Sequence, residues 1–246
     1  MSVLASSQNS AVQSDNAAAY YQCLLMHAHV ILKLGYGRLD TSELCSADEE
    51  DITGLLAEAM NEALASPESP AWRCFYSVHE EPRVKSKTLR GKRRLRLDIQ
   101  VEYTGGRRPR FSFEAKRLRA ADANSIGKYF GEEGMGCFVL GLYASEDEEA
   151  GMLAYVQSDD HTHWATAIHA GLKRRIKKCE WKTENGWVSI EVAEGLATTF
   201  KTSHTRSVLN KDINIYHTIL EFLPAIAQPS IDSATASNVA EDSTNR

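Results

Sequence analysis

The sequence has no apolar run that approaches the roughly eighteen residues of a membrane-spanning helix. Its start, MSVLASSQNS, also lacks the basic flank and the apolar stretch of a signal peptide. Cysteine is scarce: the five cysteines are scattered, odd in number and without a CxxC pair. This spacing argues against a zinc site or a disulfide framework and favours reduced thiols in the core. We therefore expect a cytoplasmic protein that does not bind a membrane.

An overall excess of positive charge is lacking too, because the formal net charge of the 246 residues is −5. The charges are nevertheless unevenly distributed. The segment 83–119 carries fourteen lysines and arginines against three acidic residues, a local charge of +11, which leaves −16 on the remainder. Such a basic band is typical of a surface that binds phosphates, although charged residues also protect strand edges from aggregation. We favour phosphate binding, because clustered like charges repel one another unless a counter-charge binds.

The order of the periodic patterns predicts one α/β protein with extensions at both ends. We expect a leader and N-terminal helix over 1–45, a core over 46–143, an α/β extension packed on that core over 144–227, and a disordered tail over 228–246. The expected helices are 16–34, 47–65, 125–132, 146–157 and 161–178. The expected strands are 71–78, 93–103, 110–116, 137–143, 187–192 and 196–203, and 213–222 fits either a strand or a helix.

Two strands over 95–116 alternate apolar and polar residues around a Gly-Gly pair, a pattern typical of a β-hairpin. If the hairpin is centred near Gly106, Asp98 lies opposite Glu114, and cross-strand partners share one face of the sheet. Lys116 shares that face because it follows Glu114 by two residues. Two carboxylates and an ammonium group are the ingredients of a metal-assisted hydrolytic site. The alternative is a solvated face on which opposite charges form weak ion pairs.

The order helix, three strands, helix and strand over 46–143, with Asp98 followed sixteen residues later by Glu114, Ala115 and Lys116, resembles the PD-(D/E)XK nuclease superfamily. The resemblance implies a restriction-endonuclease-like core, with a mixed sheet flanked by helices. It implies a metal-dependent endonuclease that hydrolyses phosphodiester bonds, in DNA rather than RNA, and that is similar to effectors of bacterial restriction or antiviral defence systems. The sequence departs from the family pattern at one place, because a leucine precedes Asp98 where the family name has proline.

Taken position by position, the resemblance implies that Asp98, Glu114 and the carbonyl oxygen of Ala115 bind Mg²⁺ or Mn²⁺. Magnesium prefers oxygen ligands and usually holds only one or two carboxylates together with phosphate and water. Lys116 would orient or activate the attacking water and offset the charge that develops on the scissile phosphate. The resemblance thus implies a catalytic set with these residues on two paired strands.

Glu49 has two alternative roles. Many members of the superfamily place a glutamate at the start of the first helix, three residues before its first apolar position, and Glu49 has this spacing to Ile52. Ser46 and Glu49 also form a capping-box pattern, in which Glu49 would serve only the helix end. Both roles stay open at this point, and Glu50 is the fallback for the site.

Basic side chains near the hairpin and in two later segments are candidates for contact with nucleic acid. They are Arg93, Arg94, Arg96, Arg107, Arg108, Lys128, His204 and Arg206. No zinc finger or similar module for base recognition is evident, so specificity would come from a partner protein or from the extension, and a homo-oligomer is compatible with the sequence. The alternative function is a non-catalytic nucleic-acid-binding or assembly subunit that keeps the fold and the basic band.

Overall fold

The computed structural model describes residues 23–84, 90–105, 108–177, 181–196 and 198–225, with the backbone alone at 93 and at 182–185. The predicted leader and tail, and the first part of the expected helix 16–34, lie outside these residues. Within the described residues the first element is helical over 23–36. None of the described helices is long and apolar enough to cross a membrane.

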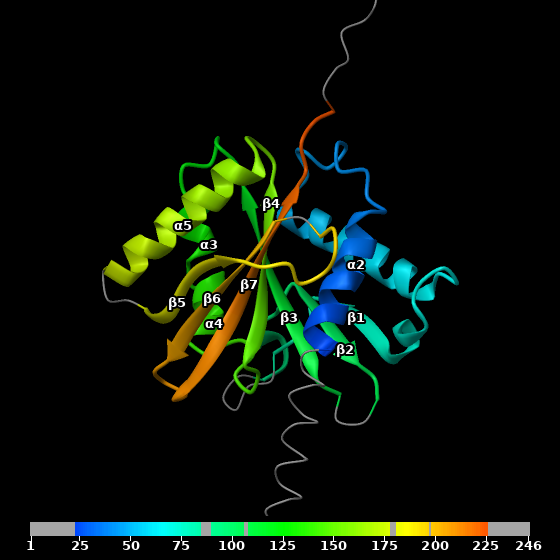
Figure 1. Cartoon of the computed structure of the whole chain (residues 1–246), viewed down its shortest axis with the longest axis horizontal. Coiled ribbons are helices and arrows are strands. Elements are labelled where there is room, and N and C mark those ends of the chain that lie inside the picture. The colour runs from blue at the N-terminus through cyan, green and yellow to red at the C-terminus, as the bar shows by residue number, and fades with distance from the viewer. Residues whose placement is uncertain (1–22, 85–89, 106–107, 178–180, 197, 226–246) are drawn as a thin grey trace, which may run out of the picture.

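Seven strands form one mixed sheet in the order β1-β2-β3-β4-β7-β6-β5 (Figure 1). Their bounds are β1 Tyr76–Glu80, β2 Ile99–Tyr103, β3 Arg110–Leu118, β4 Glu149–Val156, β5 Lys182–Ser189, β6 Thr199–Arg206 and β7 Lys211–Glu221. The three central strands β3, β4 and β7 are parallel, and the neighbouring pairs on both sides are antiparallel. The protein is therefore an α/β protein with a mixed sheet, as expected.

Helices cover both faces of this sheet. They are α2 Glu49–Ala65, α3 Ser125–Tyr129, α4 Met135–Val139 and α5 His161–Lys177, and two 3-10 turns lie at Ala71–Phe75 and Gly91–Arg93. The segment 23–36 and α2 share one apolar cluster with the sheet, and α3, α4 and α5 share another. Figure 1 shows the first group on the right of the sheet and the second on the left.

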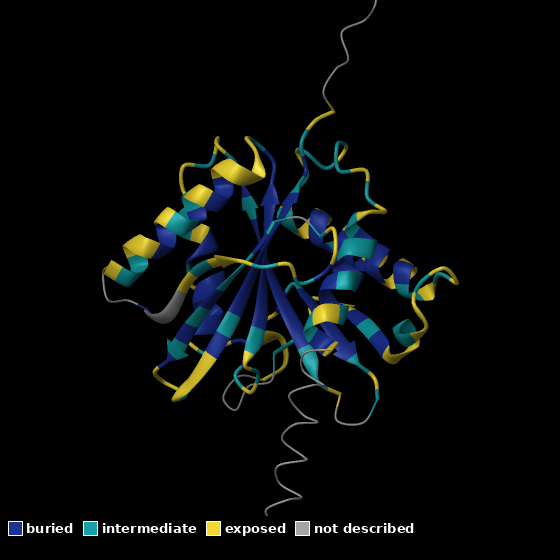
Figure 2. Ribbon diagram, in the orientation of Figure 1, coloured by how far each residue is buried: buried dark blue, intermediate teal, exposed yellow. Residues whose placement is uncertain are grey.

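The central strands β3 and β4 are buried on both faces (Figure 2). The sequence of β4 is the nearly continuous apolar run that such burial favours, whereas β3 alternates apolar with polar or charged residues. In β3 the buried residues include Ser112, Glu114 and Lys116, so the polar face predicted for the hairpin is inside the protein. Burying ionised groups is costly unless they are paired or bind a counter-charge. This burial makes the solvated-face interpretation of the hairpin wrong.

Two expected elements are exchanged in the structure. The apolar run 137–143 was expected to be a strand, but its first part belongs to α4 and the rest is a turn with Gly141 at a φ of 71°. The segment 146–157 was expected to be a helix because acidic residues begin it, but it contains β4. The sheet is continuous from β1 to β5, so it takes strands from both 46–143 and 144–227.

Candidate active site

The site lies where β2 and β3 separate. Ile99 pairs with Phe113 and Gln100 with Ser112, which is the register predicted for the hairpin. Asp98 stands one residue before β2, and its Oδ2 accepts a hydrogen bond of 2.6 Å from the backbone N–H of Ala115. The carboxylate therefore takes the place of a backbone acceptor and lies between the two strands.

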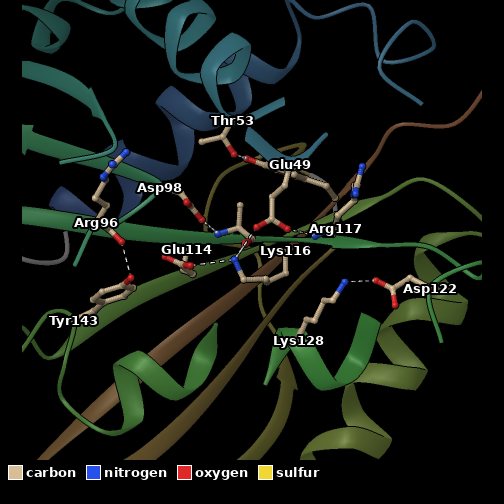
Figure 3. Close-up of polar contacts among 12 residues, drawn as sticks. Glu49, Thr53, Arg96, Asp98, Glu114, Lys116, Arg117, Asp122, Lys128 and Tyr143 are labelled. Carbon is tan, nitrogen blue, oxygen red and sulfur yellow. Dashed lines mark hydrogen bonds and ion pairs between the residues drawn. The ribbon is translucent and has the colours of Figure 1, made fainter. Parts of the chain in front are cut away.

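The ammonium group of Lys116 contacts three oxygen atoms (Figure 3). Its Nζ donates to the carbonyl oxygen of Ala115 at 2.6 Å, to Oε1 of Glu49 at 2.7 Å and to Oε1 of Glu114 at 3.1 Å. Glu114 and Ala115 are two of the predicted metal ligands, and Glu49 is the residue whose role the sequence left open. The structure thus shows that they converge on one positive charge.

Glu49 is fixed in this position from its other side. Its Oε2 accepts a hydrogen bond of 2.8 Å from the backbone N–H of Arg117, whose guanidinium pairs with Asp48 at 2.7 Å. Glu49 is the first residue of α2, and the N-cap residue Asp48 makes no side-chain capping bond. The capping box predicted for Ser46 and Glu49 is therefore wrong, and the carboxylate of Glu49 reaches β3. Glu50 is exposed.

Burial dominates the electrostatics of the cluster. Burial raises the pKa of Glu114 well above its ordinary value, and the nearby charge of Asp98 adds to this although Lys116 opposes it. Burial also raises the pKa of Asp98, against the opposing effects of Lys116 and of the hydrogen bond from Ala115. Burial alone would lower the pKa of Lys116, but the negative charges of Glu114, Glu49 and Asp98 outweigh it and raise that pKa. Lys116 is therefore a fixed positive charge.

The donor set fits a divalent cation in its chemistry and its charge. Two carboxylates, those of Glu49 and Glu114, contact one ammonium group, and the charge of a third, Asp98, also acts on it, so the fully ionised cluster carries a net charge of −2. Oε2 of Glu114 is buried and has no hydrogen-bond partner among the described residues. The same residues contain no group of three or more His, Cys, Asp or Glu side chains arranged to hold a metal ion. A metal would thus depend on two carboxylates and a carbonyl oxygen, a set that suits magnesium.

The basic residues predicted to contact nucleic acid are only partly accessible. Arg107 and the side chain of Arg93 lie outside the described residues. Arg96 is exposed and pairs with Glu81, and Arg94 is half-buried beside it. Arg108 has a positive φ of 50°, and its exposed guanidinium lies 3.7 Å from Glu102. Lys128 pairs with Asp122 at 2.7 Å and is exposed, on α3 below the cluster in Figure 3.

His204 and Arg206 have internal roles, so the prediction that they contact phosphate is wrong. Both are fully buried. Nε2 of His204 lies 2.8 Å from the hydroxyl of Thr202, and burial lowers the pKa of His204 to about 4, which keeps the ring neutral. The guanidinium of Arg206 donates to the carbonyl oxygens of Ala144 at 2.7 Å and of Asp147 at 2.6 Å.

Sequence reasoning missed two contributors to the site. Arg117 supplies the N–H that fixes Glu49, and the hydroxyl of Tyr143 donates to the carbonyl oxygen of Arg96, close to Asp98 in the chain. Alternation along β3 could have placed the side chain of Arg117, which pairs with Asp48, on the face opposite Lys116, where α2 lies, but it gives no signal for the backbone N–H. Nothing in the sequence around Tyr143 indicated its contact.

Comparison of the chain with protein-family models, with curated proteins and with solved structures gave no match. The functional argument therefore depends on the geometry and the charges of the site.

Proposed function

We propose that this protein is a nuclease that uses a divalent metal ion to hydrolyse phosphodiester bonds, in DNA rather than RNA. The observation that carries the proposal is the convergence of Glu49, Glu114 and the Ala115 carbonyl oxygen on Lys116, with Asp98 bonded to the same strand. Gathering one buried and two half-buried carboxylates near a single ammonium group leaves excess negative charge, which favours the binding of a cation.

The arrangement of the elements supports the same proposal. A helix, three antiparallel strands, two short helices and a fourth strand parallel to the third follow one another from α2 to β4. This order supports the restriction-endonuclease-like core that the sequence resemblance implies, although the fourth strand is β4 at Glu149–Val156 and not the expected 137–143. Asp98 directly precedes β2, Glu114 lies on the adjacent strand β3, and Glu49 begins the first helix of that core.

In this proposal Asp98, Glu114 and the Ala115 carbonyl oxygen hold Mg²⁺ or Mn²⁺. When bound, the ion would polarise the phosphoryl oxygen and lower the pKa of the attacking water. The free Oε2 of Glu114 is available as a ligand without breaking any hydrogen bond within the described residues. Asp98 keeps one oxygen on the Ala115 N–H, which orients the carboxylate.

Lys116 acts through its charge. The neighbouring negative charges raise its pKa, which favours the protonated ammonium group and a role as hydrogen-bond donor over that of a general base. It instead donates hydrogen bonds and offsets the negative charge that develops on the phosphate. Glu49 positions this ammonium group, because its two oxygens join Lys116 to the backbone of Arg117. Arg94, Arg96 and Arg108 supply positive charge for neighbouring phosphates.

A second candidate function is a non-catalytic nucleic-acid-binding or assembly subunit. One observation favours this function: Lys116 already donates to three oxygen atoms, and these contacts would stabilise the fold without any metal. In that case the basic residues would still bind phosphates, and the cluster would only join α2 to β3.

A cleavage assay separates the two functions. Labelled single-stranded and double-stranded DNA and RNA are incubated with the protein in Mg²⁺, Mn²⁺ or EDTA, with Lys116→Ala as the comparison. We expect cleavage that needs the metal and that Lys116→Ala abolishes. Binding that weakens with salt, but without cleavage of any substrate in either metal, would overturn the nuclease proposal and favour the subunit.

A further inference from the structure

A pocket of about 480 Å³ opens on the face of β2 and β3 that also carries the catalytic cluster. Gln100 and Ser112 line it, and they are cross-strand partners joined by a hydrogen bond of 3.2 Å from Nε2 of Gln100 to Oγ of Ser112. Gln100 follows Asp98 by two residues, and Ser112 precedes Glu114 by two. Two residues along a strand span about 6.6–6.8 Å. The pocket therefore begins one side chain away from the candidate metal ligands.

The far wall of the pocket is built by a buried arginine. Residues 144–147 form this wall, and the guanidinium of Arg206 donates to the carbonyl oxygens of Ala144 and Asp147 at its two ends. Arg206 is completely buried, which is unusual for an arginine. Ala144 also has a positive φ of 48°. The wall is therefore held in a defined position by groups that the catalytic cluster does not use.

The lining of the pocket combines apolar, polar and positively charged groups, the three kinds that bind a nucleotide. Leu97 and Pro109 offer apolar surface, and Gln100, Ser112 and Asp147 offer polar atoms. Burial raises the pKa of Asp147 to about 6, against the opposing charge of Arg206, so this carboxyl group can accept or donate a hydrogen bond near neutral pH. Unpaired bases are recognised by such polar atoms at their edges and by contact on their faces.

Positive charge completes the lining. Arg83, Arg108 and Arg110 contribute guanidinium groups, and the buried Nε of Arg110 has no hydrogen-bond partner among the described residues. Arginine is well suited to hold phosphate oxygens. The volume of about 480 Å³ lies within the usual range for small-molecule sites. A pocket of this size can hold one nucleotide but is too small for stacked base pairs.

We propose that this pocket receives one unpaired nucleobase of the strand that is cut, beside the scissile phosphate. The inference rests on the proposed nuclease function and adds a substrate class, which is nucleic acid with an unpaired nucleotide at the cleavage site. Gln100, Ser112 and Asp147 hydrogen-bond the edge of the base, and the arginines hold the phosphates that flank it. Taking a base out of a stack is least costly where it is already unpaired.

Binding without cleavage tests the proposal. Fluorescence anisotropy in EDTA compares three labelled DNA duplexes: one fully paired, one with a single unpaired nucleotide, and one in which that nucleotide is abasic. We expect the wild-type protein to bind the duplex with the unpaired base at least fivefold more tightly than the other two duplexes. A fivefold difference in affinity is about what one hydrogen bond contributes. Gln100→Leu should remove this preference, and Ser112→Ala is a smaller change that should reduce it.

Arg83→Ala and Arg90→Ala provide a matched pair, because each removes one arginine from the basic segment and only Arg83 lines the pocket. Arg83→Ala should weaken binding of the unpaired duplex more than Arg90→Ala does, with thermal unfolding used to check the fold of every variant. Equal binding of all three duplexes by the wild type, or a preference that survives in the pocket variants, would overturn the proposal. These outcomes are independent of cleavage, which the Lys116→Ala assay reports separately.

Discussion

Nζ of Lys116 lies 2.7 Å from Oε1 of Glu49, a residue 67 positions earlier in the chain. This contact joins the first residue of α2 to the middle of the sheet. The same ammonium group contacts Glu114 on its own strand, so one lysine holds a helix end and a candidate metal ligand together. Substitution of Lys116 should therefore affect both chemistry and stability, and the two effects can be measured apart.

Lys116→Met should lower kcat for Mg²⁺-dependent cleavage by about 10²–10³-fold, the range found when one group that stabilises developing charge is removed. It should also lower the free energy of unfolding at pH 7 by about 3 kcal/mol, because it leaves buried carboxylates without their partner. The stability loss should be smaller at pH 5, where Glu114 can take up a proton. Cleavage kinetics and urea unfolding at both pH values measure these effects.

Lys211→Met is the control, because Lys211 is an exposed lysine at the start of β7. It should change neither kcat nor stability appreciably. Equal cleavage by the wild type and Lys116→Met would show that the ammonium group has no part in catalysis.

Comparing Glu49→Gln with Glu50→Gln tests whether Glu49 acts in the candidate active site or only stabilises the start of α2. Both residues lie in the first turn of α2, so each substitution removes a similar favourable interaction with the helix dipole. Only Glu49 contacts Lys116 and the Arg117 N–H. We expect Glu49→Gln to lower kcat by at least tenfold and Glu50→Gln to leave it within about twofold. Steady-state kinetics decide between the roles, and similar effects of the two variants would assign Glu49 to the helix alone.

Metal binding should release protons and become tighter as the pH rises. The pKa values of Glu114 and Asp98 are raised in the folded protein, chiefly by burial, so wherever either group carries a proton a bound cation displaces it. Calorimetric titration with Mn²⁺ in two buffers of different ionisation enthalpy measures the released protons. Glu114→Gln should abolish binding. Binding that is independent of pH and unaffected by Glu114→Gln would place the metal elsewhere.

Acid should destabilise the fold through three buried histidines. Burial lowers the pKa of His29 to about 4, of His204 to about 4 and of His217 to about 3, the last with a smaller effect from His204. The unfolded chain therefore binds protons more tightly than the folded one below about pH 6.5. Each histidine stabilises the fold fully above that pH, and the stabilisation falls by about 1.4 kcal/mol per pH unit down to its folded pKa.

The test compares the slope of unfolding free energy against pH between 6.5 and 4.5 in His217→Asn and in His163→Asn. His217 is buried between Tyr129 and Thr202, whereas His163 is exposed. Only His217→Asn should make the slope shallower. Comparing variants is necessary because buried carboxyl groups with raised pKa values, such as Asp147, change stability in the opposite direction. Identical slopes would contradict a neutral, buried His217.

The hairpin register was predictable because alternation at period two and a Gly-Gly turn leave few alternatives. That register brought Asp98 opposite Glu114 and placed Lys116 on the same face. The burial of this face was not predictable from the hairpin alone, because it depends on how elements later in the chain pack over it. The role of Glu49 was also undecided in the sequence, since a capping box and a site residue can have the same local spacing.

The exchange of helix and strand between 137–143 and 149–156 has a physical reason. Short apolar runs fit a buried strand and a buried helix equally well, and tertiary packing decides between them. Cys137 and Phe138 pack in the cluster under α5 as part of a helix. The later run, AGMLAYV, is the more typical parallel strand, and the acidic residues before it resemble a helix start.

The central position of β3 has a consequence for fragments of this protein. One edge of β3 pairs with β2, and the other pairs with β4 from Phe113 to Leu118. A fragment that ends at residue 143 would keep Asp98, Glu114 and Lys116 but would leave that second edge unpaired. An unpaired, apolar strand edge is a template for association with other chains. The strand that carries the candidate metal ligands would then be the one most prone to aggregate.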